Sequence, residues 1–333
     1  MTEKSDGRDA ILRGLHVIDG GLASELECLG ARIDGPLWSA HVLEDEPEKV
    51  LTVHRAYIAA GSQCIATCSY QVSRMGYAEA GFSPERADAA LLRSVELARS
   101  AAAEFPGRKV LVAGSLGPYG AALHNGAEYH GNYDCSFDDL VRFHRERIEV
   151  FANATCSQAP DLLHPAGQES PAGGPDLLAF ETFPSLEEVR AVGEALASSN
   201  RLQGPQLRAW FSFSCRDEKH VSHGEPVAEC AALVAALPQT VAIGVNCVPP
   251  KWIPSLIGEL RKGSDLPIMV YPNSGEEWDA AARCWTGKSE PEEFGTLAAE
   301  WFAAGAQIVG GCCRTRPAHI RAVARAARLT VPN

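Results

Sequence analysis

Three cysteines stand at positions from which their sulfur atoms could share one metal ion. Cys312 and Cys313 are adjacent and follow Gly310 and Gly311 at the end of an apolar segment. Neighbouring side chains on a strand point to opposite faces, so both can reach one ion only if the strand ends there, and glycines ease such a turn. Cys247 also ends an apolar segment and could supply a third thiolate. Three thiolates suit Zn²⁺ and leave one tetrahedral position open, as in catalytic sites.

The same cysteines also admit an interpretation without a metal. A cysteine is commonly a small buried hydrophobic residue, and some of the eleven cysteines in this chain fall at strand ends by chance. No CxxC framework is present, so spacing alone leaves metal binding and simple packing both open. An odd number of cysteines argues against a disulfide framework, and in a reducing compartment we expect the cysteines to be thiols, buried packing residues or metal ligands.

The elements that must position these cysteines alternate between short strands and amphipathic helices. Apolar, β-branched segments predict eight strands, at His16–Gly20, Gln63–Thr67, Val110–Gly114, Leu177–Glu181, Arg208–Ser214, Val241–Cys247, Ile268–Asn273 and Gln307–Cys312. Helical periodicity predicts helices at Pro47–Ala60, Pro84–Ala103, Phe137–Phe151, Leu186–Ala197, Ala228–Leu237, Trp252–Leu260, Pro291–Ala304 and Pro317–Arg328. This alternation is typical of a (β/α)8 TIM barrel, although a doubly wound open sheet would alternate in the same way.

The positions of the polar motifs favour the barrel. Each motif stands where an apolar segment ends, at Asp19–Gly21, Glu181–Thr182, Asn246–Cys247, Asn273–Gly275 and Gly310–Cys313. A closed barrel collects functional residues from the carboxyl ends of many strands, whereas an open sheet gathers them at one switch point. We therefore expect a single α/β domain over residues 1–333, folded as a (β/α)8 TIM barrel.

Two longer segments interrupt the alternation. Asn153–Pro175 is rich in Pro, Gly, Ala and Ser without periodicity, which predicts a flexible insert before the fourth strand, on the face away from the motifs. Gly117–Asp139 follows the third strand and contains four glycines and three tyrosines. It should overhang the face that carries the motifs, so we expect it to act as a lid.

Composition limits the possible partners. The net charge is −12, from 30 Lys and Arg against 42 Asp and Glu, with no basic block. This balance argues against nucleic acid and anionic membrane surfaces as partners. No apolar run is long enough to span a membrane, and the polar start MTEKSDGRDA lacks the pattern of a signal peptide, so we expect a cytoplasmic protein. The sequence does not define an oligomeric state.

Eight motifs spread along the chain carry a resemblance to a known family. They are DGGLASEL at 19–26, ATCSYQ at 66–71, GSLGPYG at 114–120, AFETF at 179–183, WFSFS at 210–214, GVNC at 244–247, VYPNSGE at 270–276 and GGCCRT at 310–315. Together they resemble the homocysteine S-methyltransferase family, and most closely its branch that uses S-methylmethionine or S-adenosylmethionine. The resemblance implies a barrel with zinc held by Cys247, Cys312 and Cys313. The insert is the main departure from the family pattern.

The resemblance implies a reaction that this donor set supports. A thiol of ordinary pKa, about 8.5, is mostly protonated at neutral pH, and the thiolate is the nucleophile. Zinc in the open position would bind homocysteine as the thiolate. Three cysteine thiolates leave the site at a net charge of −1, which is poor for activating water but suits attack by a bound sulfur. We therefore expect methyl transfer from a sulfonium donor to L-homocysteine, giving methionine.

The family resemblance also suggests partners for the amino acid part of homocysteine. Asp19 and Glu181 are expected to hold its ammonium, although an Asp beside two glycines often only forms a turn and a Glu before Thr can cap a helix. For the substrate carboxylate we expect Thr67, Gln71 and the backbone amides of Gly20 and Gly21. Asn246 and Asn273 complete the expected substrate-binding residues, although they could instead orient the metal ligands.

The same residues admit two alternative functions. The acceptor could be selenocysteine or another small thiol, because the same site would serve a selenolate. In a different class, the chain could be a non-catalytic barrel that stores or senses zinc, which would not need acidic residues in the cleft.

In the methyltransferase interpretation, aromatic rings could face the sulfonium, and the candidates are Tyr119, Tyr129 and Trp285. Four histidines in loops lack metal-binding spacing, namely His124, His130, His220 and His223.

Overall fold

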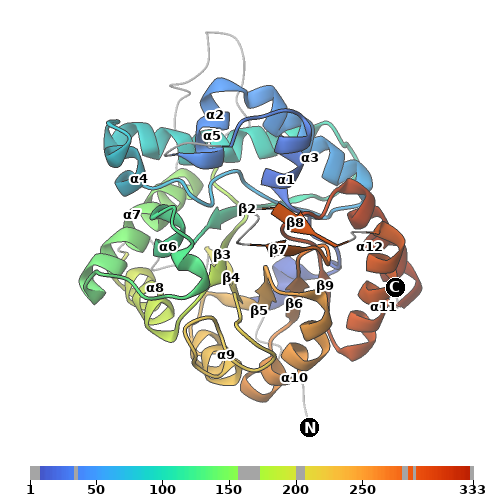
Figure 1. Cartoon of the computed structure of the whole chain (residues 1–333). Helices are drawn as coiled ribbons and strands as arrows, with labels where there is room; N and C mark the ends of the chain where they lie inside the picture. The colour runs from blue at the N-terminus through green and yellow to red at the C-terminus, as the bar shows by residue number, and fades with distance from the viewer. Residues whose placement is uncertain are drawn as a thin grey trace.

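A curled sheet of seven parallel strands forms the centre of the molecule (Figure 1). The computed structural model describes residues 8–33, 37–156, 173–199, 207–279, 284–287 and 290–330. The strand order is β1-β2-β3-β4-β5-β6-β9. The strands are β1 Cys64–Ala66, β2 Leu111–Leu116, β3 Leu177–Phe183, β4 Arg208–Phe213, β5 Thr240–Asn246, β6 Ile268–Tyr271 and β9 Ile308–Val309. Seven of the eight predicted strands are therefore confirmed.

The first predicted strand, His16–Gly20, does not form a ladder of the sheet, so this expectation is corrected. Its residues instead make two isolated parallel bridges, from Val17 to Val309 of β9 and from Ile18 to Cys64 of β1. The segment leaves the sheet at Asp19, whose carboxylate accepts a hydrogen bond from the Ala66 N–H at 2.8 Å. The segment thus lies between the two edge strands of the sheet and touches both.

Eight helices surround the sheet (Figure 1). They are α3 Pro47–Ala60, α5 Pro84–Ala103, α7 Phe137–Cys156, α8 Leu186–Ser198, α9 Val227–Ala235, α10 Ile253–Gly263, α11 Pro291–Ala304 and α12 Pro317–Thr330. All eight correspond to predicted helices. The ring is continuous at the chain ends, because α12 packs against α3.

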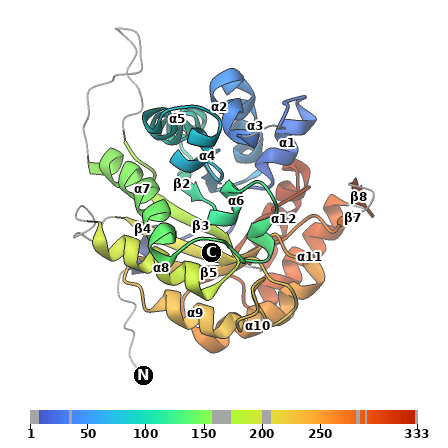
Figure 2. The ribbon, with the colours of Figure 1, turned by 60° about the vertical axis from the view of Figure 1, so that its left-hand side comes forward.

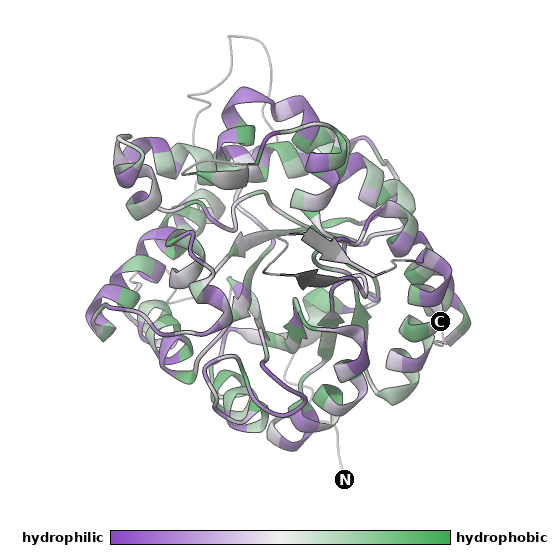
Figure 3. Ribbon diagram, in the orientation of Figure 1, coloured by the Kyte–Doolittle hydropathy of each residue, from purple (hydrophilic) through white to green (hydrophobic). Residues whose placement is uncertain are grey.

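Local sequence explains why several helix starts are well predicted. Proline is the first residue of α3, α5 and α11, where its missing N–H costs nothing and its fixed φ suits a helix. Ser185 caps α8 by accepting a hydrogen bond from the Glu188 N–H at 3.2 Å. In Figure 3 the outer helices carry both hydrophobic and hydrophilic residues, as expected for helices with one buried face.

The two faces of the sheet bury different clusters, as alternation along a strand requires. Leu178 and Phe180 of β3 belong to the large cluster between the sheet and the helices. Leu177 and Ala179 belong to a smaller cluster on the concave side, together with Leu12 and residues from the other strands. The concave side is therefore filled with side chains at one level and is available for a site only at the carboxyl ends of the strands.

Shorter elements lie outside this repeat and were not predicted. They are helices α1 Leu22–Cys28, α2 Val42–Asp45, α4 Arg74–Glu79 and α6 Tyr119–Ala122, the 3-10 turns η1 Arg8–Leu12, η2 Trp38–His41, η3 Ala127–Tyr129 and η4 Pro250–Trp252, and the antiparallel strands β7 Glu277–Asp279 and β8 Cys284–Thr286. The β7–β8 pair projects at the edge of the molecule in Figure 2. No helix within the described ranges is long and apolar enough to cross a membrane.

The structure bears differently on the predicted insert and on the predicted lid. The insert predicted at 153–175 is shorter than expected, because α7 continues to Cys156. Residues 157–172 of that prediction lie outside the described residues. The predicted lid, Gly117–Asp139, contains α6 and η3 and contributes residues to the main cavity of the molecule. Its position over the carboxyl ends of the strands is confirmed, whereas closure of a lid stays a prediction.

Candidate active site

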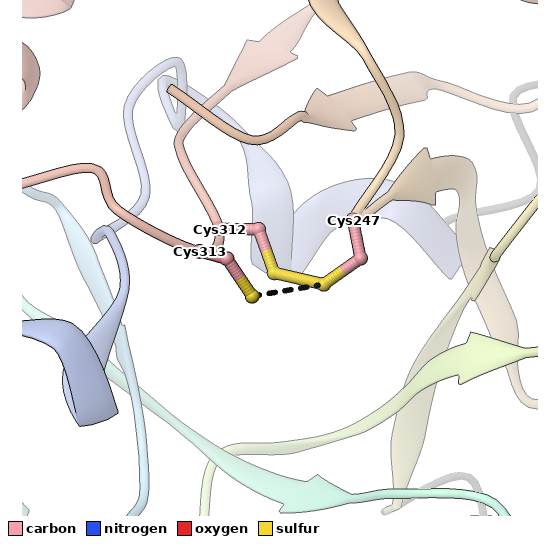
Figure 4. Close-up of side chains that lie close together, drawn as sticks. All are labelled: Cys247, Cys312 and Cys313. Atoms are coloured by element: carbon pink, nitrogen blue, oxygen red, sulfur yellow. Dashed lines mark hydrogen bonds between the residues drawn. A yellow bond between two sulfur atoms is a disulfide. The ribbon is translucent and has the colours of Figure 1, made fainter. Parts of the chain in front are cut away.

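The three cysteines proposed from sequence meet at the wall of the main cavity (Figure 4). Their sulfur atoms all lie within 4.8 Å of one another. Cys247 and Cys312 are joined by a disulfide, with their Cα atoms 5.5 Å apart, and the Cys313 Sγ lies 3.9 Å from the Cys247 Sγ. The expectation of thiols, buried packing residues or metal ligands without disulfides is therefore corrected for Cys247 and Cys312, which are paired with each other in this structure.

Glycines allow the loop that carries Asp19 and the loop that carries Cys312 to approach each other. A Cβ on Gly21 would lie 2.4 Å from the Cys312 carbonyl oxygen, and one on Gly310 would lie 2.7 Å from the Asp19 carbonyl oxygen. The Gly311 N–H donates to that same Asp19 oxygen at 3.0 Å. Gly310 and Gly311 do not adopt positive φ, so their contribution is close packing and not the easy turn expected from sequence.

Four non-glycine residues with left-handed backbone all line this cavity. They are His124, Thr182, Cys247 and Arg314, with φ of 53°, 67°, 52° and 65°. Such a conformation costs about 1–2 kcal/mol for a residue with a side chain. Strain of this kind concentrates at functional sites, where the surrounding structure maintains it. Here it turns Cys247 out of the end of β5 and toward Cys313.

The two acids proposed for the substrate ammonium both reach the cavity. Asp19 is 6% exposed, and burial raises its carboxyl pKa well above the usual value. Burial also raises the pKa of the Glu181 carboxyl to about 7, against hydrogen bonds from Ser115 and Tyr271 that lower it. The Glu181 charge contributes to the raised pKa of Asp19. Two carboxylates in one partly dry cavity are suited to hold a cation.

The remaining predicted substrate residues also line the cavity, but several side chains and amides are already engaged. The Thr67 hydroxyl accepts from the Ser115 N–H at 3.0 Å and bonds Ser69 at 2.6 Å. The Gly21 N–H donates to the Thr315 hydroxyl at 3.0 Å, so it is not directed at a substrate carboxylate. Gln71 and Gly20 lie in the cavity wall.

Two asparagines differ in their surroundings. The Asn246 amide donates to Thr182 Oγ1 at 2.8 Å and to the Cys312 Sγ at 3.9 Å, so it supports the cysteine group. The Asn273 Oδ1 is buried and has no hydrogen-bond partner among the described residues. An orphaned acceptor in a cavity wall suits a ligand that donates hydrogen bonds, such as an ammonium.

The cavity measures about 1210 Å³ and opens at the carboxyl ends of the strands. It also contains residues that the motif analysis did not assign, notably Tyr70, Glu128 and Tyr271. Tyr129 was expected only as an aromatic face, yet its side chain lowers the pKa of the Cys313 thiol, which burial raises. The glycine- and tyrosine-rich composition of the predicted lid was the available signal for Glu128 and Tyr129. The side chain of Trp285 lies outside the described residues.

The other sequence candidates have minor places. His124 lines the cavity and neither ring nitrogen has a hydrogen-bond partner among the described residues, whereas His130 is exposed. His220 pairs with Asp217, and His223 with Glu225. Tyr119 packs on Tyr133 with ring centroids 5.4 Å apart. None of these contacts involves a cysteine of the site.

The fold and site together define an α/β enzyme whose cavity lies at the carboxyl ends of parallel strands and is lined by thiols and carboxyl groups. The family model described as homocysteine S-methyltransferase matches residues 16–327. The chain belongs to the homocysteine S-methyltransferase family.

Relatives and solved structures agree with this assignment. The chain is 40% identical over 322 residues to homocysteine S-methyltransferase YbgG of Bacillus subtilis, covering 94% of this chain and 95% of the relative. It is 37% identical to selenocysteine Se-methyltransferase of Brassica oleracea var. italica, covering 93% and 88% of the two chains. The metallated form of homocysteine methyltransferase MmuM of Escherichia coli superposes with a TM-score of 0.78 at 39% identity, covering 95% and 98%.

A second structure of the same Escherichia coli protein is also similar to this chain. Its oxidized form superposes with a TM-score of 0.79 at 38% identity, covering 96% of this chain and 99% of that chain. The relative is thus known in metallated and oxidized forms. The present chain is an enzyme that transfers a methyl group to homocysteine, a small-molecule substrate.

Proposed function

We propose that the reduced chain binds one Zn²⁺ through Cys247, Cys312 and Cys313 and transfers a methyl group from a sulfonium donor to L-homocysteine. The donor is S-methylmethionine or S-adenosylmethionine, and the product is methionine. The observation that carries this proposal is the convergence of three cysteine sulfurs within 4.8 Å in the wall of a cavity that is also lined by the carboxyl groups of Asp19 and Glu181, among others.

The distance between one pair of the sulfurs fits a tetrahedral zinc site. With Zn–S bonds of about 2.3 Å, neighbouring sulfurs of a tetrahedron lie about 3.8 Å apart. The Cys247 and Cys313 sulfurs are 3.9 Å apart. The disulfide between Cys247 and Cys312 must be reduced first, because only thiolates bind the metal. The Escherichia coli relative is known in a metallated form, which supports a metal in this chain.

The chain's own groups explain why methyl transfer is favoured over hydrolysis. When bound, zinc would hold the homocysteine sulfur as a thiolate, which is the nucleophilic form. Three cysteine thiolates leave a net charge of −1, so a water molecule there would be weakly activated. The attacking sulfur forms a new bond to the methyl carbon as the bond to the donor sulfur breaks. The electron pair remains on the donor sulfur, which becomes a neutral thioether.

Asp19 and Glu181 are proposed to hold the ammonium of homocysteine. Both carboxyl groups reach the cavity and both have pKa values raised by burial, which an adjacent cation would reverse. The orphaned Oδ1 of Asn273 could accept a hydrogen bond from the same ammonium. For the carboxylate we propose Gln71, Thr67 and the amide of Gly20, while the engaged amide of Gly21 would have to exchange its partner.

Selenocysteine is the second candidate acceptor, because a relative at 37% identity is a selenocysteine Se-methyltransferase and a selenolate would bind the same open position.

We also propose that residues 16–18 act as the eighth strand, since they bridge β1 and β9 and would close the sheet into a (β/α)8 barrel. Free thiolates at the site require a reducing compartment, which favours the cytoplasm.

One set of measurements tests the proposed function. Reduced protein is incubated with homocysteine and, separately, S-methylmethionine or S-adenosylmethionine, and methionine formation is followed. Bound zinc is measured in the wild type and in Cys247→Ser, with Cys230→Ser as a control at a buried cysteine that lies outside the cavity wall. We expect about one zinc per chain in the wild type and control and little in Cys247→Ser. Full zinc content in Cys247→Ser would contradict the assignment.

A further inference from the structure

A carboxylate that the proposed acceptor site does not use lines the same cavity. Glu128 lies in η3, within the segment that follows β2 and overhangs the cysteines. Its Oε2 is buried and accepts no hydrogen bond from any described residue. Burial also raises the pKa of this carboxyl group, against a hydrogen bond from its own backbone N–H. A buried carboxylate oxygen without a partner is costly, so its retention indicates a ligand.

The backbone that carries Glu128 is held firmly. The Ser214 hydroxyl donates to the Glu128 carbonyl at 3.0 Å, and the Ser222 hydroxyl donates to Ser214 at 2.8 Å. Gly120 packs directly against this turn, since a Cβ there would lie 2.4 Å from the Glu128 nitrogen. The carboxylate is therefore presented to the cavity from a fixed position, as recognition of a ligand requires.

The surroundings of Glu128 place it near the reacting centre. Glu128, the next residue Tyr129 and Cys313 line the same cavity, and the charge of Glu128 contributes to the raised pKa of the Cys313 thiol. Tyr70 is another residue of the cavity wall, and the charge of Glu128 contributes, after burial, to the raised pKa of its hydroxyl. Glu128 thus combines with two aromatic side chains on the cavity wall, beside the cysteines. A carboxylate accompanied by aromatic faces is suited to a cation that cannot donate hydrogen bonds.

We propose that Glu128 provides the counter-charge for the sulfonium of the methyl donor. This inference rests on the proposed function, in which the homocysteine ammonium is already assigned to Asp19 and Glu181. The methyl carbon must come within about 3–3.5 Å of the acceptor sulfur before transfer. The donor sulfur, and not its more distant ammonium, must then lie closest to Cys313 and its neighbours. Glu128 is one of those neighbours, because it precedes Tyr129 in the chain and both residues line the cavity with Cys313.

This placement has a defined consequence for substrate and product. The donor sulfur is positive before transfer and is a neutral thioether afterwards, so the attraction to Glu128 disappears with the reaction. Glu128 therefore favours the sulfonium over the product and helps the product to leave. Because the charge is already dispersing in the transition state, Glu128 should act on donor KM more than on kcat.

The test compares a sulfonium with its neutral counterpart. S-methylmethionine and methionine are titrated by calorimetry into zinc-loaded wild type, Glu128→Gln and Glu128→Asp, without homocysteine, and initial rates are measured in parallel. The control is Glu293→Gln, because Glu293 is an exposed carboxylate that lines the same cavity. We expect Glu128→Gln to weaken S-methylmethionine binding by about 10- to 100-fold and to leave methionine binding unchanged. Glu128→Asp should restore part of the loss, and Glu293→Gln should match the wild type.

Other outcomes would overturn the proposal. Equal losses for S-methylmethionine and methionine would place Glu128 at the donor ammonium, and unchanged binding of both would remove it from the donor site. Absence of measurable S-methylmethionine binding to the wild type would also reject the inference. Homocysteine is titrated into the same preparations, and its failure to bind the wild type would reject the proposed function separately.

Discussion

The side-chain amide of Asn246 donates to the Sγ of Cys312 at 3.9 Å, from the position immediately before Cys247. The same amide donates to Thr182 Oγ1 at 2.8 Å and accepts from the Thr182 N–H at 2.9 Å. One buried side chain therefore connects the carboxyl ends of β3 and β5 to the sulfur group. Hydrogen bonds of this kind orient metal ligands and reduce the charge on a thiolate.

Replacing Asn246 with alanine should weaken zinc binding by about 10- to 100-fold, because Cys312 would lose the group that orients it. Competition with a chelator of known affinity measures the change in the reduced protein. Asn273→Ala is the matched control, since it removes an amide from the same cavity without a contact to sulfur among the described residues. Equal zinc affinities in Asn246→Ala and the wild type would show that the contact has no role in metal binding.

Reduction should be required before the site binds a metal. The disulfide uses two of the three sulfur atoms, so the oxidised chain retains only Cys313 as a ligand. We expect protein prepared without reductant to show two fewer titratable thiols and little bound zinc, and both values to recover after reduction. Thiol counting under denaturing conditions and zinc analysis of the same samples provide the measurement. Full zinc loading of the oxidised chain would contradict the ligand set.

Homocysteine binding should strengthen as pH rises through about 7. The Glu181 carboxyl has a pKa of about 7 and must be ionised to pair with an ammonium, so at one unit below that value the affinity falls by about tenfold. Asp19 acts in the same direction, because its pKa is also raised. Glu181→Gln should show weaker binding and a shallower pH dependence. Identical slopes in calorimetric titrations of the two proteins would remove Glu181 from the substrate site.

The same carboxyl group should destabilise the folded chain at high pH. Its pKa rises from 4.5 to about 7 on folding, so the folded state holds the proton more tightly than the unfolded state. Stability is therefore greatest below pH 4.5 for this group and declines as pH rises to 7. Because the side chain is partly exposed to the cavity, we expect Glu181→Gln to raise the free energy of unfolding at pH 8 by only about 1–3 kcal/mol. Urea denaturation measures this gain, and a loss of stability would contradict it.

Much of the fold follows from local sequence signals, and the exceptions have physical causes. Pro47, Pro84 and Pro291 mark helix starts that match the structure, because proline is compatible with the first turn and not with later ones. The segment at 16–20 reads as a strand from its apolar residues, but Asp19 bonds Ala66 and ends the pairing. The β7–β8 pair lacks both a long apolar run and periodicity, so sequence pattern alone did not indicate it.

The candidate site was predictable where the residue type carries the chemistry. The adjacent cysteines and the acids at strand ends could be selected as candidates from residue type and position, whereas their roles were implied by the family resemblance, because spacing alone also admits packing, turn and cap roles. The role of Glu128 depends on Ser214 and Gly120, which are distant in sequence and meet it only in the fold. The engagement of the Gly21 amide with Thr315 is likewise a long-range contact that local pattern does not predict.

In the proposed site three cysteines hold zinc and leave its fourth position for the homocysteine sulfur. X-ray absorption at the zinc edge counts the sulfur ligands directly. For the reduced, zinc-loaded protein we predict three sulfurs at about 2.3 Å and one lighter ligand, changing to four sulfurs when homocysteine is added. A sulfur count that stays the same on adding homocysteine at saturating concentration would contradict this account.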